Sequence, residues 1–272
     1  VWTERSTWNP IGGFGDVYSN DIWQNVHDPP LWRDPFTGVP IPFRATYEVT
    51  TAGPSGKLDV PVDAFLWNPE EDAFMPVEAD TRATSKVIFD YSKYFQSKWH
   101  NGQPITMADV VYSIYQSFDI AYDDKKTRIE TAMAVTTRPF LDTFQGFRVL
   151  DDNRLEVYVD FWNFEDNYIA SYASPAALSM PWELLFAMDT LVFDSKGKPP
   201  KPKALYSATA AAKHQRPWIS LVMDRDARLV RNVLRGFTRD EELPENILTI
   251  GGKTLVTAKE AKDRYQAALD WW

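Results

Sequence analysis

The chain has 272 residues and a formal net charge of −9 at pH 7. Nucleic-acid binding requires a basic surface, and this charge indicates none. It contains no cysteine, which excludes disulfides, thiolate metal ligands and cysteine nucleophiles. A hydrophobic fraction of 44%, with 16 Phe, 12 Tyr and 11 Trp, argues for a folded core, and no apolar run reaches the roughly 18 residues of a membrane span.

Residues 1–45 are dense in Gly, Pro and Asn turn signals, and within them 17–26 is either a short helix or an extended segment. The glycines of 12–15 lack the spacing of a dinucleotide-binding loop, so we interpret them as a flexible or close-packed loop. Residues 46–91 are predicted to be β-structure. Their alternation places strands at 60–67, 74–77 and 85–91.

The next segment contains the clearest helix. Thr106 and Asp109 form an acidic version of the capping box, and the apolar spacing that follows predicts a helix over 107–118. Residues 146–160 are predicted to be a β-hairpin, because apolar residues alternate on both sides of an Asp-Asp-Asn turn. The remainder is predicted to be mostly helical, at 182–188, 204–214, 225–237 and 257–272, with a linker-like stretch at 194–203.

Catalytic and metal-binding patterns are missing from the sequence. No nucleophile elbow, phosphate loop or zinc-binding His pair is present, and the three histidines are far apart. The acidic runs at 70–72, 123–124 and 151–152 lack the spacing of a calcium loop, so we interpret them as solvated turns. The sequence therefore predicts a protein that is not an enzyme and that uses no cofactor or metal.

The aromatic residues favour a binding function. Tryptophan presents a flat apolar face that suits sugar rings and peptide side chains. The candidates for such stacking are Trp23, Trp32, Trp67 and Trp99, and packing in the core is the alternative for each of them.

One segment carries a family resemblance. Residues 98–113 read Lys-Trp-His-Asn-Gly-Gln-Pro-Ile-Thr-Met-Ala-Asp-Val-Val-Tyr-Ser. They resemble the signature of family 5 extracellular solute-binding proteins, the receptors of dipeptide, oligopeptide and related ABC importers, although Met107 stands where that signature has Ala. The segment at 151–157 is similar to the hairpin of that family, and 16–38 is similar to its amino-terminal region.

The resemblance implies an α+β fold, with a mixed sheet and flanking helices, as part of a type II periplasmic-binding-protein-like fold. It covers about residues 10–185, and the family's second lobe has no counterpart in this sequence. We therefore expect a lobe-forming domain at 1–185, a mostly helical extension or insertion at 186–272, and a chain that is a fragment of a longer protein. A cleft with one lobe is expected to bind ligand weakly or undetectably by itself.

The implied function is capture of a small solute, an oligopeptide or an oligosaccharide, in the extracellular or periplasmic space. The implied partner is an ABC permease, the protein is expected to be a monomer, and the full-length protein is expected to be tethered to the membrane. The resemblance places ligand contacts at Asp16, Val17, Tyr18 and Ser19, and stacking adds Trp23. The alternatives are a glycoside hydrolase, because 38 acidic residues always offer some carboxylate pair, and a structural cell-surface domain without ligand.

Overall fold

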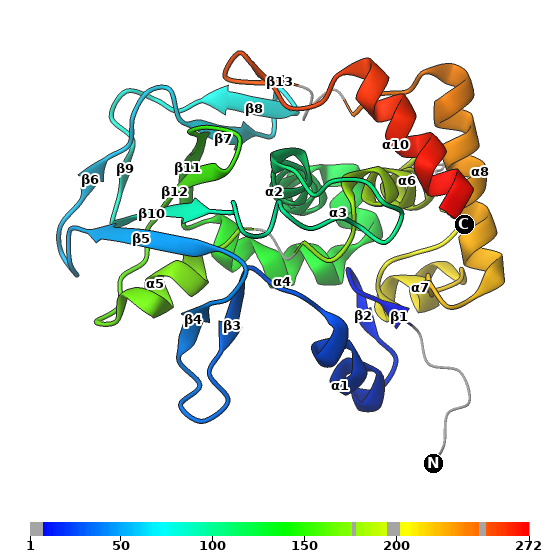
Figure 1. Ribbon diagram of the computed structural model, residues 1–272, viewed down its shortest axis with the longest axis horizontal. Helices are drawn as coiled ribbons and strands as arrows, with labels where there is room; N and C mark the ends of the chain where they lie inside the picture. The colour runs from blue at the N-terminus through cyan, green and yellow to red at the C-terminus, as the bar shows by residue number, and fades with distance from the viewer. Residues whose placement is uncertain (1–7, 176–177, 195–201, 245–248, 272) are drawn as a thin grey trace.

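The computed structural model describes residues 8–175, 178–194, 202–244 and 249–271. A six-stranded sheet forms one side of the molecule, and most of the helices form the other side (Figure 1). The predicted α+β class is confirmed. The prediction of a mixed sheet is wrong, because every strand pair described in the large sheet is antiparallel. Hairpins join β7 to β8 and β11 to β12, and a hairpin can pair only antiparallel strands.

The large sheet has the strand order β5-β10-β12-β11-β7-β8. Its strands are β5 (Thr46–Thr51), β7 (Phe65–Asn68), β8 (Ala73–Pro76), β10 (Ser85–Asp90), β11 (Phe144–Val149) and β12 (Arg154–Val159). Val87 of β10 lies opposite Val49 on one side and Val157 on the other. Every second residue of β10 is buried, which confirms the alternation predicted for this strand.

Four short antiparallel pairs lie outside this sheet. They are β1 (Trp8–Asn9) with β2 (Gly13–Phe14), β3 (Leu31–Arg33) with β4 (Pro40–Pro42), β6 (Leu58–Asp59) with β9 (Arg82–Ala83), and β13 (Thr249–Ile250) with β14 (Lys253–Thr254). The strand predicted over 60–67 is shorter in the structure, because residues 60–64 carry the turn that leads into β7.

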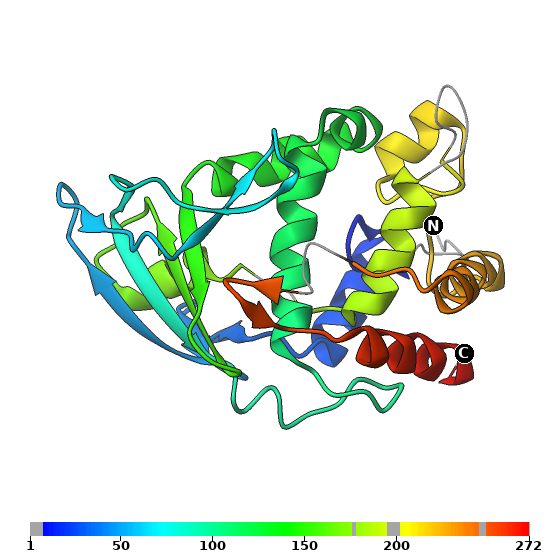
Figure 2. The ribbon, with the colours of Figure 1, turned by 90° about the horizontal axis from the view of Figure 1, so that it is seen from above.

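Helix α2 (Met107–Tyr122) crosses the middle of the molecule, between the sheet and the carboxyl-terminal helices (Figure 2). The side-chain carboxylate of Asp109 accepts a hydrogen bond from the Thr106 backbone amide at 2.8 Å, as the predicted capping box requires. The helix runs four residues beyond its predicted end, and Asp123 then caps the next helix. The other helices are α1 (Val17–Val26), α3 (Asp124–Ile129), α4 (Thr131–Leu141), α5 (Asp166–Ala173), α6 (Trp182–Phe193), α7 (Ala208–His214), α8 (Asp224–Asp240) and α10 (Ala258–Trp271).

The sequence did not predict α3, α4 or α5. Helix α4 contains three threonines and Pro139, which are poor helix formers, so its apolar pattern was not recognised. Tertiary contacts with α2 hold it in place: the guanidinium of Arg138 donates to the Ala121 carbonyl at 2.6 and 2.9 Å. The linker predicted at 194–203 lies mostly outside the described residues.

The predicted boundary at residue 185 falls within α6, whose residues on both sides of it are buried. Trp182 of α6 packs edge-on against Tyr265 of α10, at 5.7 Å between ring centroids. Residues of the sheet, of α2 and of α6, α8 and α10 belong to one hydrophobic core. The helical part after residue 185 therefore shares its buried surface with the part before it.

Candidate functional site

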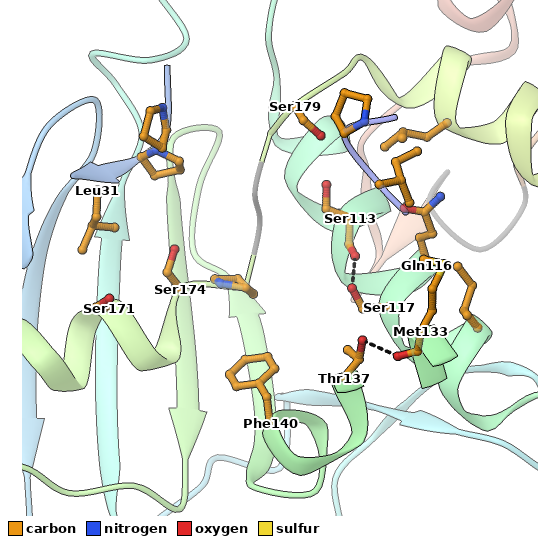
Figure 3. A pocket seen from close by; sticks show the side chains of 17 residues that line it. Leu31, Ser113, Gln116, Ser117, Met133, Thr137, Phe140, Ser171, Ser174 and Ser179 are labelled. Carbon is orange, nitrogen blue, oxygen red and sulfur yellow. Dashed lines mark hydrogen bonds between the residues drawn. The ribbon is translucent and has the colours of Figure 1, made fainter. Parts of the chain in front are cut away.

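A cavity of about 480 Å³ opens beside α2. Its walls come from α2 and α4, from the amino-terminal segment at Pro10 and Ile11, from the loop at Pro29–Leu31, and from the end of α5 and the segment that leads into α6. Among the described residues, six hydroxyl side chains line it: Ser113, Ser117, Thr137, Ser171, Ser174 and Ser179. Figure 3 shows those of α2 and α4 on one wall and Ser171 and Ser174 on the facing wall. Leu185 of α6 also lines it, so the cavity brings together residues up to 175 positions apart in the chain.

Asn9 holds the amino-terminal segment against the rest of the molecule. Its side-chain amide donates to the carbonyl of Tyr206 at 3.0 Å, and its side-chain oxygen accepts from the amides of Ile11 and Gly12. A Cβ atom on Gly12 would lie 1.8 Å from the Tyr206 carbonyl oxygen, so only glycine fits there. The glycine-rich loop is thus close-packed at Gly12, and this contact brings Pro10 and Ile11 to the cavity.

The buried carboxylate of Glu130 fixes the other side of that contact. It accepts from the Tyr206 amide at 2.7 Å and from the Ser207 hydroxyl at 2.6 Å. Burial raises the pKa of Glu130, and these hydrogen bonds oppose that rise. Glu130 and Asn9 together hold the segment at 206–207 by both its amide and its carbonyl.

The hydroxyls on the two walls differ in their bonding. Ser113, Ser117 and Thr137 donate to backbone carbonyls four residues earlier in their own helices, at 2.9 to 3.0 Å, so each faces the cavity as an acceptor. Within the described part of the chain, the hydroxyls of Ser171 and Ser174 have no hydrogen-bond partner. They can both donate to a bound molecule and accept from it.

Gln116 is oriented by a buried acid. Its side-chain amide nitrogen donates to Asp189 at 2.8 Å, and the hydroxyls of Tyr112 and Tyr206 donate to the same carboxylate at 2.6 and 2.7 Å. Burial raises the pKa of Asp189, and the three donors oppose that rise. Because a carboxylate accepts hydrogen bonds, the nitrogen of Gln116 must face Asp189 and its oxygen is the end left for the cavity.

The predicted ligand residues lie on and before α1, away from the described lining of this cavity. Asp16 caps α1: its carboxylate accepts from the amide of Ser19 at 2.8 Å and from the Ser19 hydroxyl at 2.9 Å. Ser19 is buried, while Val17 and Tyr18 are 63% and 74% exposed. Trp23 is half-buried and stacks on His27. Asp16 caps α1 and the other four residues lie on it, and the role of all five in ligand binding stays a prediction.

The other tryptophans occupy varied positions. Trp67 is buried in the core between Phe74 and Tyr115, so the core interpretation holds for it. Trp32 lies on β3 beside Phe43, and the half-buried Trp99 packs against the core. Within the described lining of the cavity the one aromatic ring is that of Phe140, which the sequence analysis did not select.

Three acidic residues from two segments lie close together near the end of α2. Asp72, Asp119 and Asp123 can each place a carboxylate oxygen within 4.8 Å of the other two. Asp119 is buried and forms an ion pair with Lys126, and burial raises its pKa to about 6. Oxygen ligands of this kind suit hard cations such as Ca²⁺. The sequence interpretation treated two of these acids as members of separate turns, and only the packing of β7–β8 against α2 brings them together.

The buried acids Asp189, Glu130 and Glu183 were not predicted from the sequence. A signal for two of them was present, because Glu183 and Asp189 are the only charged residues in the otherwise apolar segment of α6. An acid in such a helix must find buried partners, since an isolated charge in the core costs several kcal/mol. The identity of those partners could not be read from the segment.

No protein-family model matches the sequence, and no curated protein matches it. None of the helices in the described part of the chain combines the length and the apolar character that a bilayer crossing requires.

Proposed function

We propose that this chain is part of the substrate-capture component of an ABC importer, which holds a small solute outside the cell and delivers it to a membrane permease. The observation that carries the proposal is the hydroxyl-lined cavity of about 480 Å³ beside α2. Its volume lies within the range of roughly 300–1,000 Å³ that small-molecule sites occupy.

The signature-like segment supports the proposal through its position. Asn101, Gly102 and Pro104 form the turn before α2, with Gly102 at a φ of +82°, and Asp109 starts the helix. The helix that follows supplies Ser113 and Ser117 to the cavity. The segment that resembles family 5 receptors thus begins the helix that forms one wall of the candidate site, and its last residue, Ser113, lines the cavity.

The chemistry of the cavity favours binding over hydrolysis. Glycoside hydrolysis needs two carboxyl groups on either side of the bond that is broken. The described lining of the cavity contains no Asp or Glu. The fully buried acids Asp109 and Glu183 lie near each other, but both are engaged by Arg264. This arrangement supports a binding function over the hydrolase alternative.

The fold that we propose is one lobe of a type II periplasmic-binding-protein-like receptor, with the antiparallel sheet and α2 at its centre. A single lobe presents one face of a cleft, so the affinity of this chain for its solute is expected to be weak.

The test uses protein purified under native conditions and then denatured, with released small molecules identified by mass spectrometry. Thr137 of α4 lines the cavity, whereas its neighbour Thr136 is exposed, and both hydroxyls donate to backbone carbonyls of the same helix. Thr137→Trp should fill the cavity and Thr136→Trp should not. A molecule that is carried by the wild type and by Thr136→Trp, but not by Thr137→Trp, supports the proposal.

Two results would contradict it. Turnover of a chromogenic glycoside, lost on substitution of one acid, would support the hydrolase alternative. Self-association of the chain, with no bound molecule in any preparation, would support a structural domain without ligand.

A further inference from the structure

Among the described residues, the polar side chains that line the cavity carry no charge. Its described lining contains six hydroxyl side chains and the amide of Gln116, and no Asp, Glu, Lys, Arg or His. The remaining lining is apolar and includes the ring of Phe140 and four prolines, Pro10, Pro29, Pro30 and Pro175.

This lining discriminates against ions. A zwitterionic peptide brings an ammonium group and a carboxylate, and each must lose part of its water when it enters the cavity. An ion that is desolvated without a partner of opposite charge costs several kcal/mol. The nearby carboxylate of Asp189 is not available as that partner, because two tyrosine hydroxyls and Gln116 already donate to it.

The same lining complements a molecule rich in hydroxyl groups. Ser113, Ser117 and Thr137 face it as acceptors on one wall, and Ser171 and Ser174 on the other wall can donate or accept. The oxygen of Gln116 adds an acceptor of fixed orientation. Each sugar hydroxyl is itself both a donor and an acceptor, so it can form hydrogen bonds with the side chains of either wall.

The apolar lining completes this match. A sugar ring has a face made of C–H groups, which packs favourably on an aromatic ring. Phe140 reaches the cavity from α4, beside the hydroxyl-bearing Thr137 (Figure 3). Polar groups on facing walls and one aromatic ring thus surround a space of about 480 Å³.

We infer that this cavity selects an uncharged, hydroxyl-rich solute of the size of a mono- or disaccharide over a zwitterionic peptide. The inference rests on the proposed function and specifies its solute class. It replaces the tryptophan stacking expected from the sequence with hydroxyl groups and Phe140.

The test is saturation-transfer-difference NMR of the whole chain with maltose, cellobiose and trialanine at millimolar concentration, a method that detects weak binding. We expect a saccharide signal in the wild type and in Thr136→Trp, and its loss in Thr137→Trp. Ser171→Ala/Ser174→Ala should weaken saccharide binding by about three- to ten-fold, the effect of losing one or two neutral hydrogen bonds.

The outcomes separate the two levels of the proposal. If trialanine gives the signal that Thr137→Trp abolishes, and neither saccharide does, the inferred solute class is wrong and solute capture still stands. If neither class gives a signal and no molecule is released on denaturation, the proposed function fails together with the inference. A saccharide signal that persists in Thr137→Trp would place binding elsewhere and overturn the assignment of this cavity.

Discussion

Arg264 donates a hydrogen bond to the carboxylate of Asp109 at 3.0 Å, although the two residues lie 155 positions apart. The same guanidinium donates to Glu183 at 2.8 Å and to the carbonyl of Pro104 at 3.1 Å. The carboxylate of Asp109 also accepts from the amide of Trp182 at 3.0 Å. One buried cation therefore ties the start of α2 and the start of α6 to the carboxyl-terminal helix α10.

Removing this cation should destabilise the protein strongly. Arg264→Met leaves Asp109 and Glu183 buried without a counter-charge, so the free energy of unfolding should fall by about 3–5 kcal/mol. Urea denaturation measures this change. The exposed pair Arg239–Asp240 provides the control, and Arg239→Met should leave the free energy of unfolding nearly unchanged.

Coupling between the three groups is a separate expectation. Arg264→Met leaves the charges of Asp109 and Glu183 without a partner, and Asp109→Asn and Glu183→Gln remove those charges. The triple variant should therefore lose less free energy of unfolding than the sum of the losses in the three single variants. Losses that add within about 0.5 kcal/mol would show that the groups act independently.

Two glycines should respond in opposite directions to substitution by alanine. Gly12→Ala places a Cβ against the Tyr206 carbonyl, so the amino-terminal segment must shift and stability should fall. Gly236 lies within α8 with no atom near its Cβ position, so Gly236→Ala should raise the free energy of unfolding by about 0.5–1 kcal/mol. Thermal unfolding of both variants tests this contrast. A Gly12→Ala protein as stable as the wild type would contradict the close contact.

The buried carboxyl of Asp119 makes stability depend on pH. Its pKa is raised from 3.8 to about 6 in the folded state, mainly because burial disfavours the charged form. The folded state therefore holds this proton more tightly, and the contribution of Asp119 to stability falls as pH rises from about 4 to about 6. Asp119→Asn removes this dependence, so its stability relative to the wild type should rise over that window. NMR titration should place the midpoint of the Asp119 carboxyl near 6, and a midpoint near 4 would show that the ion pair with Lys126 offsets the effect of burial on this pKa.

Substitutions can distinguish residues of the α1 region that bind ligand from residues that stabilise the helix. Tyr18→Ala should leave the free energy of unfolding within about 0.5 kcal/mol of the wild type, because the side chain is 74% exposed. Asp16→Ala removes the helix cap and should cost about 1 kcal/mol. If Tyr18 contacts solute, Tyr18→Ala weakens binding without loss of stability. Unchanged binding would remove it from the predicted site.

Local patterns in the sequence determined the parts of this protein that depend on neighbours in the chain. Thr106 and Asp109 fixed the start of α2, and the Asp-Asp-Asn turn at 151–153 fixed the β11–β12 hairpin, because caps and turns act over a few residues. The charge balance and the absence of cysteine excluded whole classes of function in the same direct way.

Only the tertiary structure decided where distant groups meet. The cavity depends on Gly12 reaching Tyr206, and the orientation of Gln116 depends on Asp189, 73 positions away. The local role of Asp109 as a helix cap can be read from the sequence. Its buried ion pair with Arg264 cannot. Such pairings depend on how helices that are far apart in the sequence pack together. A buried charge requires a partner, but the sequence around it does not identify the residue that provides one.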